Sequence, residues 1–230
     1  GGKCERQNAK GENTYAPGDA GGDGYTWAMR ELAWDPGQCG LEQIRALCSA
    51  GRDQGVLTIR FEDGEGGESF DWSELEPMTR SRAVTAADVA ADLGSPVLEV
   101  ALCCDLVYLR HGASLVLPEI DQPASPGLVW ALSRAGRAAI AAGLLVGGRV
   151  EGGEAVRLGL VQAIVPADDP LPLPSRVSLA ALTAARDLMR SQAGGAAGRA
   201  LELATFRLLF ASGDPIEGAN AFLERRDPEF

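Results

Sequence analysis

Two glutamates stand among apolar residues in the sequence, and such surroundings suit a carboxyl group to proton transfer. Glu99 lies within the run Pro96-Val-Leu-Glu-Val-Ala-Leu-Cys-Cys104, and Glu119 follows the run Leu115-Val-Leu-Pro118. Because burial disfavours the charged form, a carboxyl group there either has a raised pKa that is useful in acid–base catalysis or is paired with a cation. The cations that we consider as such partners are Arg110, Arg134 and Arg137. Both glutamates are therefore candidate acid–base residues, and a buried ion pair is the structural alternative.

A helix start just before Glu99 supplies a candidate hydrogen-bond donor. In Gly94-Ser95-Pro96, Ser95 can be the N-cap, and Pro96 suits the first helical position, where its missing N–H has no helical partner. We expect a short buried helix from Val97 to Asp105. The Val97 amide is then an unpaired donor at the positive end of the helix, where it can stabilise a developing oxyanion. The alternative is an ordinary helix start whose amides bind water.

Several other chemistries lack the residues that they need. The single histidine, His111, lies in a predicted turn without the surroundings of a nucleophile elbow, and one histidine cannot build a multi-histidine zinc site. The five cysteines have no CxxC spacing and are odd in number, which favours reduced thiols in a cytoplasmic protein over a disulfide framework. No glycine-rich phosphate-binding motif is present, and Gly147-Gly148 and Gly152-Gly153 are expected to bracket a turn. We therefore expect no metal site and no bound cofactor.

Composition and charge indicate a folded protein and argue against some partners. Of the 230 residues, 46% are hydrophobic and 23% are charged, which is typical of globular domains. Acidic residues outnumber basic ones by 32 to 21, so binding to nucleic acid or to an anionic membrane surface is not expected. No apolar run reaches the roughly 20 residues that span a bilayer. Residues 1–24 are polar and rich in glycine, and we expect a flexible leader without a secretory signal.

The pattern of elements predicts the fold class. Val56–Phe61 is rich in β-branched residues and bounded by glycine, which predicts a strand, whereas residues 82–93 suit a helix or a strand. Further strands are expected at 106–109, 114–117 and 160–165, and helices at 41–50, 127–145, 151–158, 177–191, 196–212 and 217–225. Strands followed by helices, with alternation between them, predict one α/β domain over residues 25–170 and a helical region over 171–230.

Four stretches, in order along the chain, resemble motifs of the enoyl-CoA hydratase/isomerase (crotonase) superfamily. Leu98-Glu-Val-Ala-Leu-Cys-Cys-Asp-Leu106 resembles the family's helix motif LELALACDL, and Ala113-Ser-Leu-Val-Leu-Pro-Glu119 resembles AxFxxPE. Residues 148–166 resemble GxxxxAxEAxxxGLVxxVVP, and residues 214–225 resemble the closing DxxEGxxAFLEKR. The likeness is good from Val84 to Phe230 and thinner from Gly55 to Leu75. The chain is therefore identified as a divergent member of this superfamily.

The resemblance implies a fold, an assembly and a substrate class. Members of the superfamily fold as a spiral of ββα units with a helical C-terminal region, and they assemble as trimers or dimers of trimers. They bind acyl thioesters of coenzyme A or of a carrier protein, and two backbone amides stabilise the thioester enolate. By this likeness, region 171–230 mediates trimerisation, coenzyme A or phosphopantetheine enters as part of the substrate, and an acyl carrier protein is a candidate partner.

The resemblance also assigns roles to single residues. Glu99 and Glu119 match the two acid–base glutamates of the hydratases. The first oxyanion amide maps to Phe70, before Asp71, and the second falls on Pro96, which has no N–H. A shift of one residue gives this second role to Val97. Asp71 and Pro96 are then expected to lie in the substrate-binding site.

Two functions follow from these assignments. The first is hydration of enoyl thioesters, or the reverse dehydration, in a specialised pathway, with isomerase or decarboxylase chemistry on the same fold left open. The alternative is a non-catalytic subunit of crotonase fold that assists another enzyme. Pro96 and the atypical loop Gly66-Gly-Glu-Ser-Phe-Asp71 favour the alternative, whereas the presence of both Glu99 and Glu119 favours catalysis.

Overall fold

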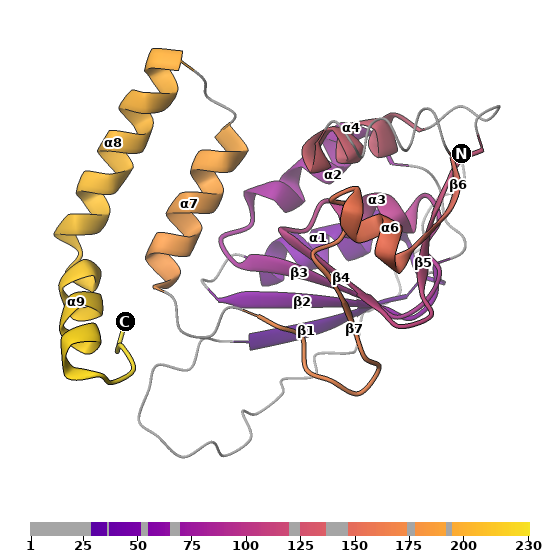
Figure 1. Ribbon diagram of the computed structural model, residues 1–230. Helices are drawn as coiled ribbons and strands as arrows, with labels where there is room; N and C mark the ends of the chain where they lie inside the picture. The colour runs from indigo at the N-terminus through magenta and orange to yellow at the C-terminus, as the bar shows by residue number, and fades with distance from the viewer. Residues whose placement is uncertain are drawn as a thin grey trace. The chain divides into compact units, whose positions relative to one another are not determined.

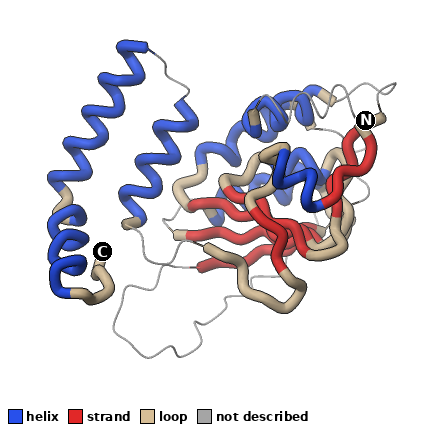
Figure 2. The backbone as a smooth tube through the Cα atoms, viewed as in Figure 1, coloured by secondary structure: helices blue, strands red, loops and turns tan. Residues whose placement is uncertain are grey.

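The computed structural model describes residues 29–35, 37–51, 55–64, 70–119, 125–136, 147–173, 178–191 and 195–230. These residues fall into two compact units, Met29–Leu171 and Pro172–Phe230, and each is described by itself. The first unit holds the strands, whereas the described part of the second is helical (Figures 1 and 2). The leader expected at residues 1–24 lies outside the described residues.

Five parallel strands form the main sheet of the first unit, in the order β1-β2-β3-β4-β7 (Figure 1). They are β1 (Met29–Trp34), β2 (Val56–Phe61), β3 (Val84–Val89), β4 (Leu106–Arg110) and β7 (Ala163–Val165). Every residue of β3 is buried. A parallel strand covered on both faces has no alternation of apolar and polar residues, which explains why residues 82–93 suited two structures by sequence. The α/β fold class and the strands expected at 56–61 and 106–109 are confirmed.

A second, antiparallel sheet pairs β5 (Ser114–Leu117) with β6 (Gly148–Glu151), with Ser114 opposite Glu151. Strand β6 corrects one prediction, because the glycine pairs at 147–148 and 152–153 do not bracket a turn. Gly148 begins this strand, and Gly152 begins helix α6 (Gly152–Arg157) directly after it. Within β6 only Val150 is buried, so four residues with one apolar side chain gave too short a pattern to recognise.

The helices that carry the candidate site lie between the strands in sequence. They are α1 (Gly40–Ala50), α2 (Trp72–Leu75), the 3₁₀ helix η1 (Glu76–Arg80), α3 (Val97–Leu102) and α4 (Pro126–Ala135). Helix α3 packs against α4 and β3, and α2 also contacts α4. In Figure 1, α2, α3 and α4 lie together above strand β3. All six residues of α3 are buried, so the polar group of Glu99 enters the hydrophobic core.

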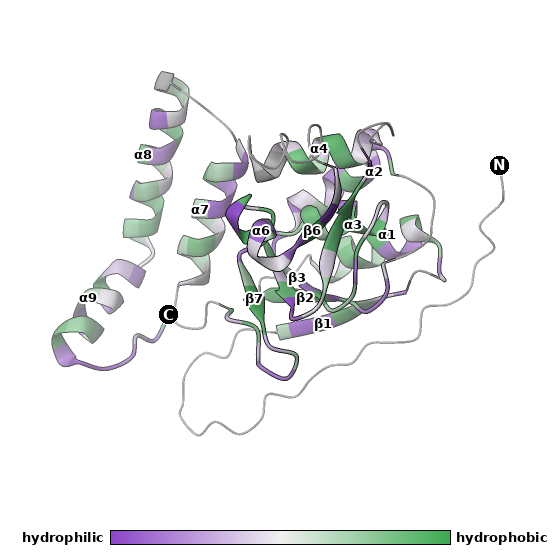
Figure 3. Cartoon of the chain, turned by 45° about the vertical axis from the view of Figure 1, so that its right-hand side comes forward, coloured by the Kyte–Doolittle hydropathy of each residue, from purple (hydrophilic) through white to green (hydrophobic). Residues whose placement is uncertain are grey.

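The second unit contains α7 (Leu179–Ser191), α8 (Gly195–Ala211) and α9 (Asp214–Glu224). Helix α8 carries apolar residues along its length (Figure 3). The large apolar side chains that α8 and α9 expose are Leu201, Leu203, Phe206, Leu208, Phe210, Ile216, Phe222 and Leu223. Phe206 and Phe210 contact each other, with ring centroids 4.4 Å apart. Within the described ranges, the helices of both units are too short or too polar to cross a membrane.

Candidate active site

Glu99 is completely buried on helix α3. Its Oε1 accepts a hydrogen bond from the hydroxyl group of Ser125, the N-cap of α4. Its Oε2 is also buried and has no hydrogen-bond partner among the residues that the structure describes. One oxygen of this carboxyl group is therefore held by a neighbour, and the other is enclosed without a hydrogen-bond donor in the described region.

Burial raises the pKa of the Glu99 carboxyl group above its usual value. Three donors oppose this effect by favouring the charged form: the Ser125 hydroxyl first, then the Phe70 backbone and the Ser95 hydroxyl. Only Ser125 has hydrogen-bond geometry among the described donors, so we regard the other two as weaker electrostatic contributions. A carboxyl group in such surroundings can exchange a proton nearer to neutral pH than an exposed glutamate can.

Gly127, in the first turn of α4, brings the helix start against Glu99. A Cβ atom on Gly127 would overlap Oε2 of Glu99 and would lie 2.7 Å from the backbone oxygen of Phe70. The unpaired carboxyl oxygen, the Phe70 backbone and the N-terminus of α4 therefore meet at one point. This contact brings together two residues that the sequence nominated for the same site, Glu99 and Phe70.

An ion pair with Arg110 was one structural alternative for Glu99, and this prediction is wrong. Arg110 donates from Nε and Nη2 to the two carboxylate oxygens of Asp88 at 2.7 and 3.0 Å, and from Nη1 to the backbone oxygens of Pro166 and Asp169, both at 2.6 Å. This arginine thus joins β3, β4 and the segment after β7. No cation pairs with Glu99 among the described side chains, which do not include those of Arg134 and Arg137.

Helix α3 begins at Val97, as expected, but it ends at Leu102 rather than at Asp105. Pro96 is the N-cap, and the Ser95 side chain makes no capping hydrogen bond, which corrects the predicted N-cap at Ser95. The Gly94 carbonyl accepts from the Leu98 amide at 2.8 Å, and the Pro96 carbonyl accepts from the Glu99 amide at 3.1 Å. The Val97 amide has no partner within the described segments, as the sequence predicted for a residue at the first helical position.

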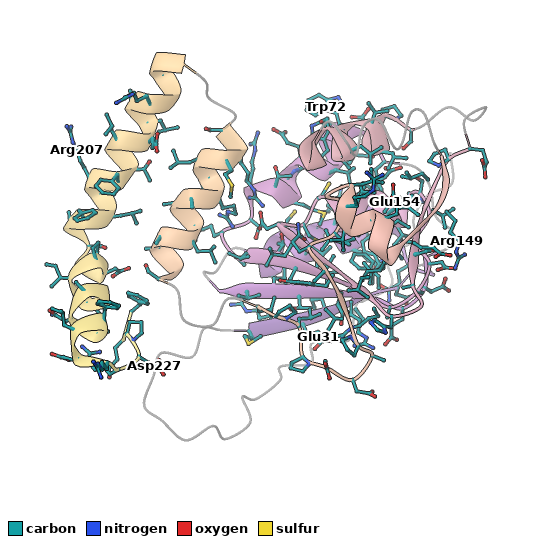
Figure 4. The ribbon with its side chains drawn as sticks, in the orientation of Figure 1. Glu31, Trp72, Arg149, Glu154, Arg207 and Asp227 are labelled. Carbon is teal, nitrogen blue, oxygen red and sulfur yellow. The ribbon has the colours of Figure 1, made fainter. Side chains whose placement is uncertain are left out.

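Asp71 has a structural role at the start of α2. Its Oδ1 accepts hydrogen bonds from the Ser73 amide at 2.9 Å and the Ser73 hydroxyl at 2.8 Å, while its own amide donates to Glu74 at 2.7 Å. The Ser73 amide, and then the Ser73 hydroxyl, lower the pKa of Asp71. Trp72 follows on the outer side of α2, as Figure 4 shows. This capping box fixes the backbone that follows Phe70. The expectation that Asp71 and Pro96 contact the substrate stays a prediction.

Phe70 is itself anchored by aromatic packing. Its side chain is buried, and its ring lies edge-on to Trp34, with centroids 6.4 Å apart. The ring also packs on the start of α1, because a Cβ atom on Gly40 would lie 2.7 Å from its Cζ atom. The backbone of Phe70 is therefore held from both sides, by its own side chain and by the Asp71 cap.

Glu119 lies at the exposed end of the segment that leaves β5. Its Oε1 would lie 3.5 Å from a Cβ atom on Gly148, whose φ of +70° also disfavours a side chain. Leu93 and Leu115 form a parallel bridge, so the segments that lead to Glu99 and to Glu119 run in the same direction side by side. The expectation that the two carboxyl groups face each other stays a prediction.

Two loops of the candidate site share an anchor. The Gly94 amide donates to the Gly64 carbonyl at 3.3 Å. A Cβ atom on Gly64 would overlap the Asp92 carbonyl oxygen and would lie 2.7 Å from the Cα atom of Leu93. The segment that precedes Phe70 and the segment that precedes Val97 are thus in backbone contact with each other.

Sequence reasoning missed Ser125 and Gly127. The sequence Ser-Pro-Gly at 125–127 does carry a helix-start signal, because serine is a favoured N-cap and proline suits the next position. Nothing local indicates that this helix start meets a residue 26 positions earlier in the chain. Among the residues described, no cluster of three or more histidine, cysteine, aspartate or glutamate side chains could hold a metal ion.

Comparisons with known proteins place this arrangement in a family. The family model for enoyl-CoA hydratase/isomerase matches residues 47–230. The probable enoyl-CoA hydratase echA8 of Mycobacterium leprae is 30% identical over 221 residues, which cover 89% of this chain and 85% of that protein. The 2,3-dehydroadipyl-CoA hydratase of Escherichia coli is 30% identical over 171 residues, which cover 69% of this chain and 66% of that protein.

Solved structures show the same fold. Enoyl-CoA hydratase subunit I of Geobacillus kaustophilus superposes with a TM-score of 0.74 at 21% identity, covering 90% of this chain and 95% of that one. Pseudomonas aeruginosa AtuE superposes with a TM-score of 0.69 at 22% identity, covering 89% and 96%. The expected crotonase-like α/β fold is thereby confirmed, and the chain belongs to the enoyl-CoA hydratase/isomerase family of the crotonase superfamily.

Proposed function

We propose that the protein is a hydratase of enoyl thioesters that uses Glu99 and Glu119 as its acid–base pair. The observation that carries this proposal is the environment of Glu99. Its carboxyl group is buried without a cation in the described region, has a raised pKa, and leaves one oxygen unpaired beside the Phe70 backbone. A carboxyl group buried in this way opposes folding in its charged form, and such groups concentrate at functional sites.

In the proposed reaction, water adds across the double bond next to the thioester. Glu99 takes a proton from the water molecule as its oxygen bonds to the β-carbon. Glu119, exposed at the end of its segment, delivers a proton to the α-carbon. The Phe70 and Val97 amides stabilise the negative charge on the thioester oxygen between these events. Dehydration is the same path in reverse.

The thioester carrier belongs to the substrate in this scheme. Coenzyme A, or the phosphopantetheine of an acyl carrier protein, brings the acyl group, and the reaction consumes only water. The names of the relatives from M. leprae and E. coli support coenzyme A as the carrier to test first. The exposed apolar residues of α8 and α9 support a homotrimer or a dimer of trimers.

A non-catalytic subunit is the second candidate function, and one observation favours it. Pro96 has no N–H, so the second oxyanion donor depends on Val97, the next residue along. Losing one oxyanion donor typically lowers a rate by about 100- to 1000-fold. Among the described residues the Val97 amide and one Glu99 oxygen have no partner, and both observations favour catalysis over this second candidate.

Substitution of the two glutamates tests the proposal. Hydration of crotonyl-CoA, followed by the loss of its ultraviolet absorbance, should fall by at least about 100-fold in Glu99→Gln and in Glu119→Gln, since general acid–base catalysis contributes about that much. Their melting temperatures should hold or rise. Glu154→Gln is the matched control, because Glu154 is paired with Arg157 on the surface of α6 (Figure 4).

Two outcomes would favour other functions. A wild-type protein that moves the double bond of a 3-enoyl thioester but adds no water would indicate an isomerase. A wild-type protein without turnover, together with early unfolding of both glutamine variants, would decide for the non-catalytic subunit.

A further inference from the structure

Ser125 makes two hydrogen bonds, one as an acceptor and one as a donor. Its oxygen accepts from the Leu128 amide at 3.1 Å, which caps helix α4. Its single proton is directed away from that amide and onto Oε1 of Glu99. The ionised Glu99 carboxylate can only accept, so in that form the direction of the Ser125–Glu99 hydrogen bond is fixed.

The consequence for Glu99 is that its two carboxyl oxygens are no longer equivalent. Oε1 is occupied by Ser125, whereas Oε2 lies beside Gly127 and the Phe70 backbone without a partner in the described region. Because Gly127 has no side chain, the first turn of α4 can pack directly against Oε2, where an added Cβ atom would overlap that oxygen.

We propose that Ser125 is a positioning residue that holds Glu99 in a single orientation, so that Oε2 is the oxygen that exchanges the proton. As a statement about catalysis this rests on the proposed hydratase function. Ser125 touches no reacting atom in this arrangement and acts through Glu99 alone. The same Ser125 hydroxyl group thereby caps the first turn of α4 and orients the Glu99 carboxyl group.

Burial has the largest effect on the pKa of Glu99, and the Ser125 hydroxyl is the strongest neighbouring group that opposes it. From β3, the only charged side chain, Asp88, is bound to Arg110. From α4, the described side chains that face Glu99 carry no charge. The Ser125 hydroxyl is the strongest of the donors that lower the pKa of Glu99 against the effect of burial. Removing this hydroxyl should therefore raise that pKa.

Three variants separate positioning from capping. Ser125→Ala removes both hydrogen bonds, Ser125→Gly removes the hydroxyl but remains a fair N-cap, and Ser125→Thr keeps both. Melting temperature should fall clearly in the alanine variant and little in the glycine variant. Ser133→Ala is the control from the same helix, because the Ser133 hydroxyl donates to the Trp130 carbonyl, away from Glu99.

Two readouts test the proposal in these variants. The first is the ¹³C resonance of the Glu99 carboxyl carbon during a pH titration of ligand-free protein, assigned by its loss in Glu99→Gln. The midpoint of this titration should move to higher pH in Ser125→Ala and Ser125→Gly. It should stay near the wild-type value in Ser125→Thr. The second is the pH profile of kcat/KM for crotonyl-CoA, whose acidic limb should move upward in the same variants. The maximum should fall by about 10-fold or more, as expected for the loss of a hydrogen bond to a charged group.

The outcomes distinguish the two proposals. An unchanged Glu99 midpoint in Ser125→Gly would overturn the positioning role, whatever the activity. A midpoint that follows melting temperature, and so moves in Ser125→Ala but not in Ser125→Gly, would also overturn it. A midpoint that moves in both variants, in a wild-type protein that hydrates no enoyl thioester, would support the control of Glu99 by Ser125 and refute the hydratase.

Discussion

A methyl group on Gly127 should damage the site more than the fold. Gly127→Ala places a Cβ atom against Oε2 of Glu99 and 2.7 Å from the Phe70 carbonyl oxygen. The Glu99 side chain is buried and held by Ser125, and the Phe70 oxygen belongs to the backbone. Because optimal contacts are about 3.5–4.0 Å, α4 and the Phe70 segment must separate by roughly 1 Å.

Two opposing effects set the change in stability. Overpacking of this kind typically costs about 1–3 kcal/mol, whereas replacing glycine by alanine within a helix contributes about 0.5–1 kcal/mol in favour of folding. We therefore expect a net loss of about 0–2.5 kcal/mol in the free energy of unfolding. A displacement of 1 Å between reacting groups can lower a rate by about 100-fold, so activity should fall far more than stability.

The assay compares two alanine variants by urea unfolding and crotonyl-CoA hydration. Gly153→Ala is the control, because Gly153 also lies in the first turn of a helix and its added Cβ would meet nothing within 4 Å. This control should be as stable as the wild type or more stable, with unchanged kcat/KM. Gly127→Ala with the stability and rate of the control would refute the contact between α4 and Glu99.

Three further predictions concern stability and assembly. Arg110→Met should lower the free energy of unfolding by about 3–5 kcal/mol, because Asp88 would stay buried without its main partner; a loss below about 1 kcal/mol in urea unfolding would contradict this. Since the pKa of Glu99 is raised in the folded protein, its neutral form favours folding below pH 4.5 and this contribution is lost as pH rises through the raised pKa. Glu99→Gln should therefore gain stability relative to the wild type as pH increases from 4 to 8 in thermal unfolding, and a constant difference would count against it. Light scattering should give three or six times 24.0 kDa for the wild type, and Phe206→Glu with Phe210→Glu should reduce that mass; a wild-type monomer would rule out the trimer.

Local sequence predicted the elements whose signals lie within a few residues. Val56–Phe61 forms a strand because β-branched residues occupy it and glycine precedes it. The Val97 amide has no partner in the described part of the chain because it stands at a helix start, and that holds although the N-cap is Pro96 rather than Ser95. Both results depend on interactions between residues that are close together in the sequence.

What the sequence did not predict depends on contacts between distant segments. Strand β6 is defined by its pairing with β5, since its own four residues show too little pattern. The role of Ser125 depends on α4 meeting α3, and the fit of Gly127 depends on a backbone oxygen more than fifty positions away in the chain. Such contacts are fixed by packing of the whole unit, which periodicity and spacing do not report.

The shared anchor of Gly64 and Gly94 lies at different distances along the chain from the two proposed oxyanion donors. Two residues, Ser95 and Pro96, separate Gly94 from Val97, so the second donor stands at nearly a constant distance from the anchor. Five residues, 65–69, separate Gly64 from Phe70. Phe70 does not depend on the anchor alone, because Trp34 and the Asp71 capping box also hold it. Substitutions at 65–69 are therefore expected to leave both proposed donors in place, so that this stretch of sequence can vary without loss of the proposed oxyanion site.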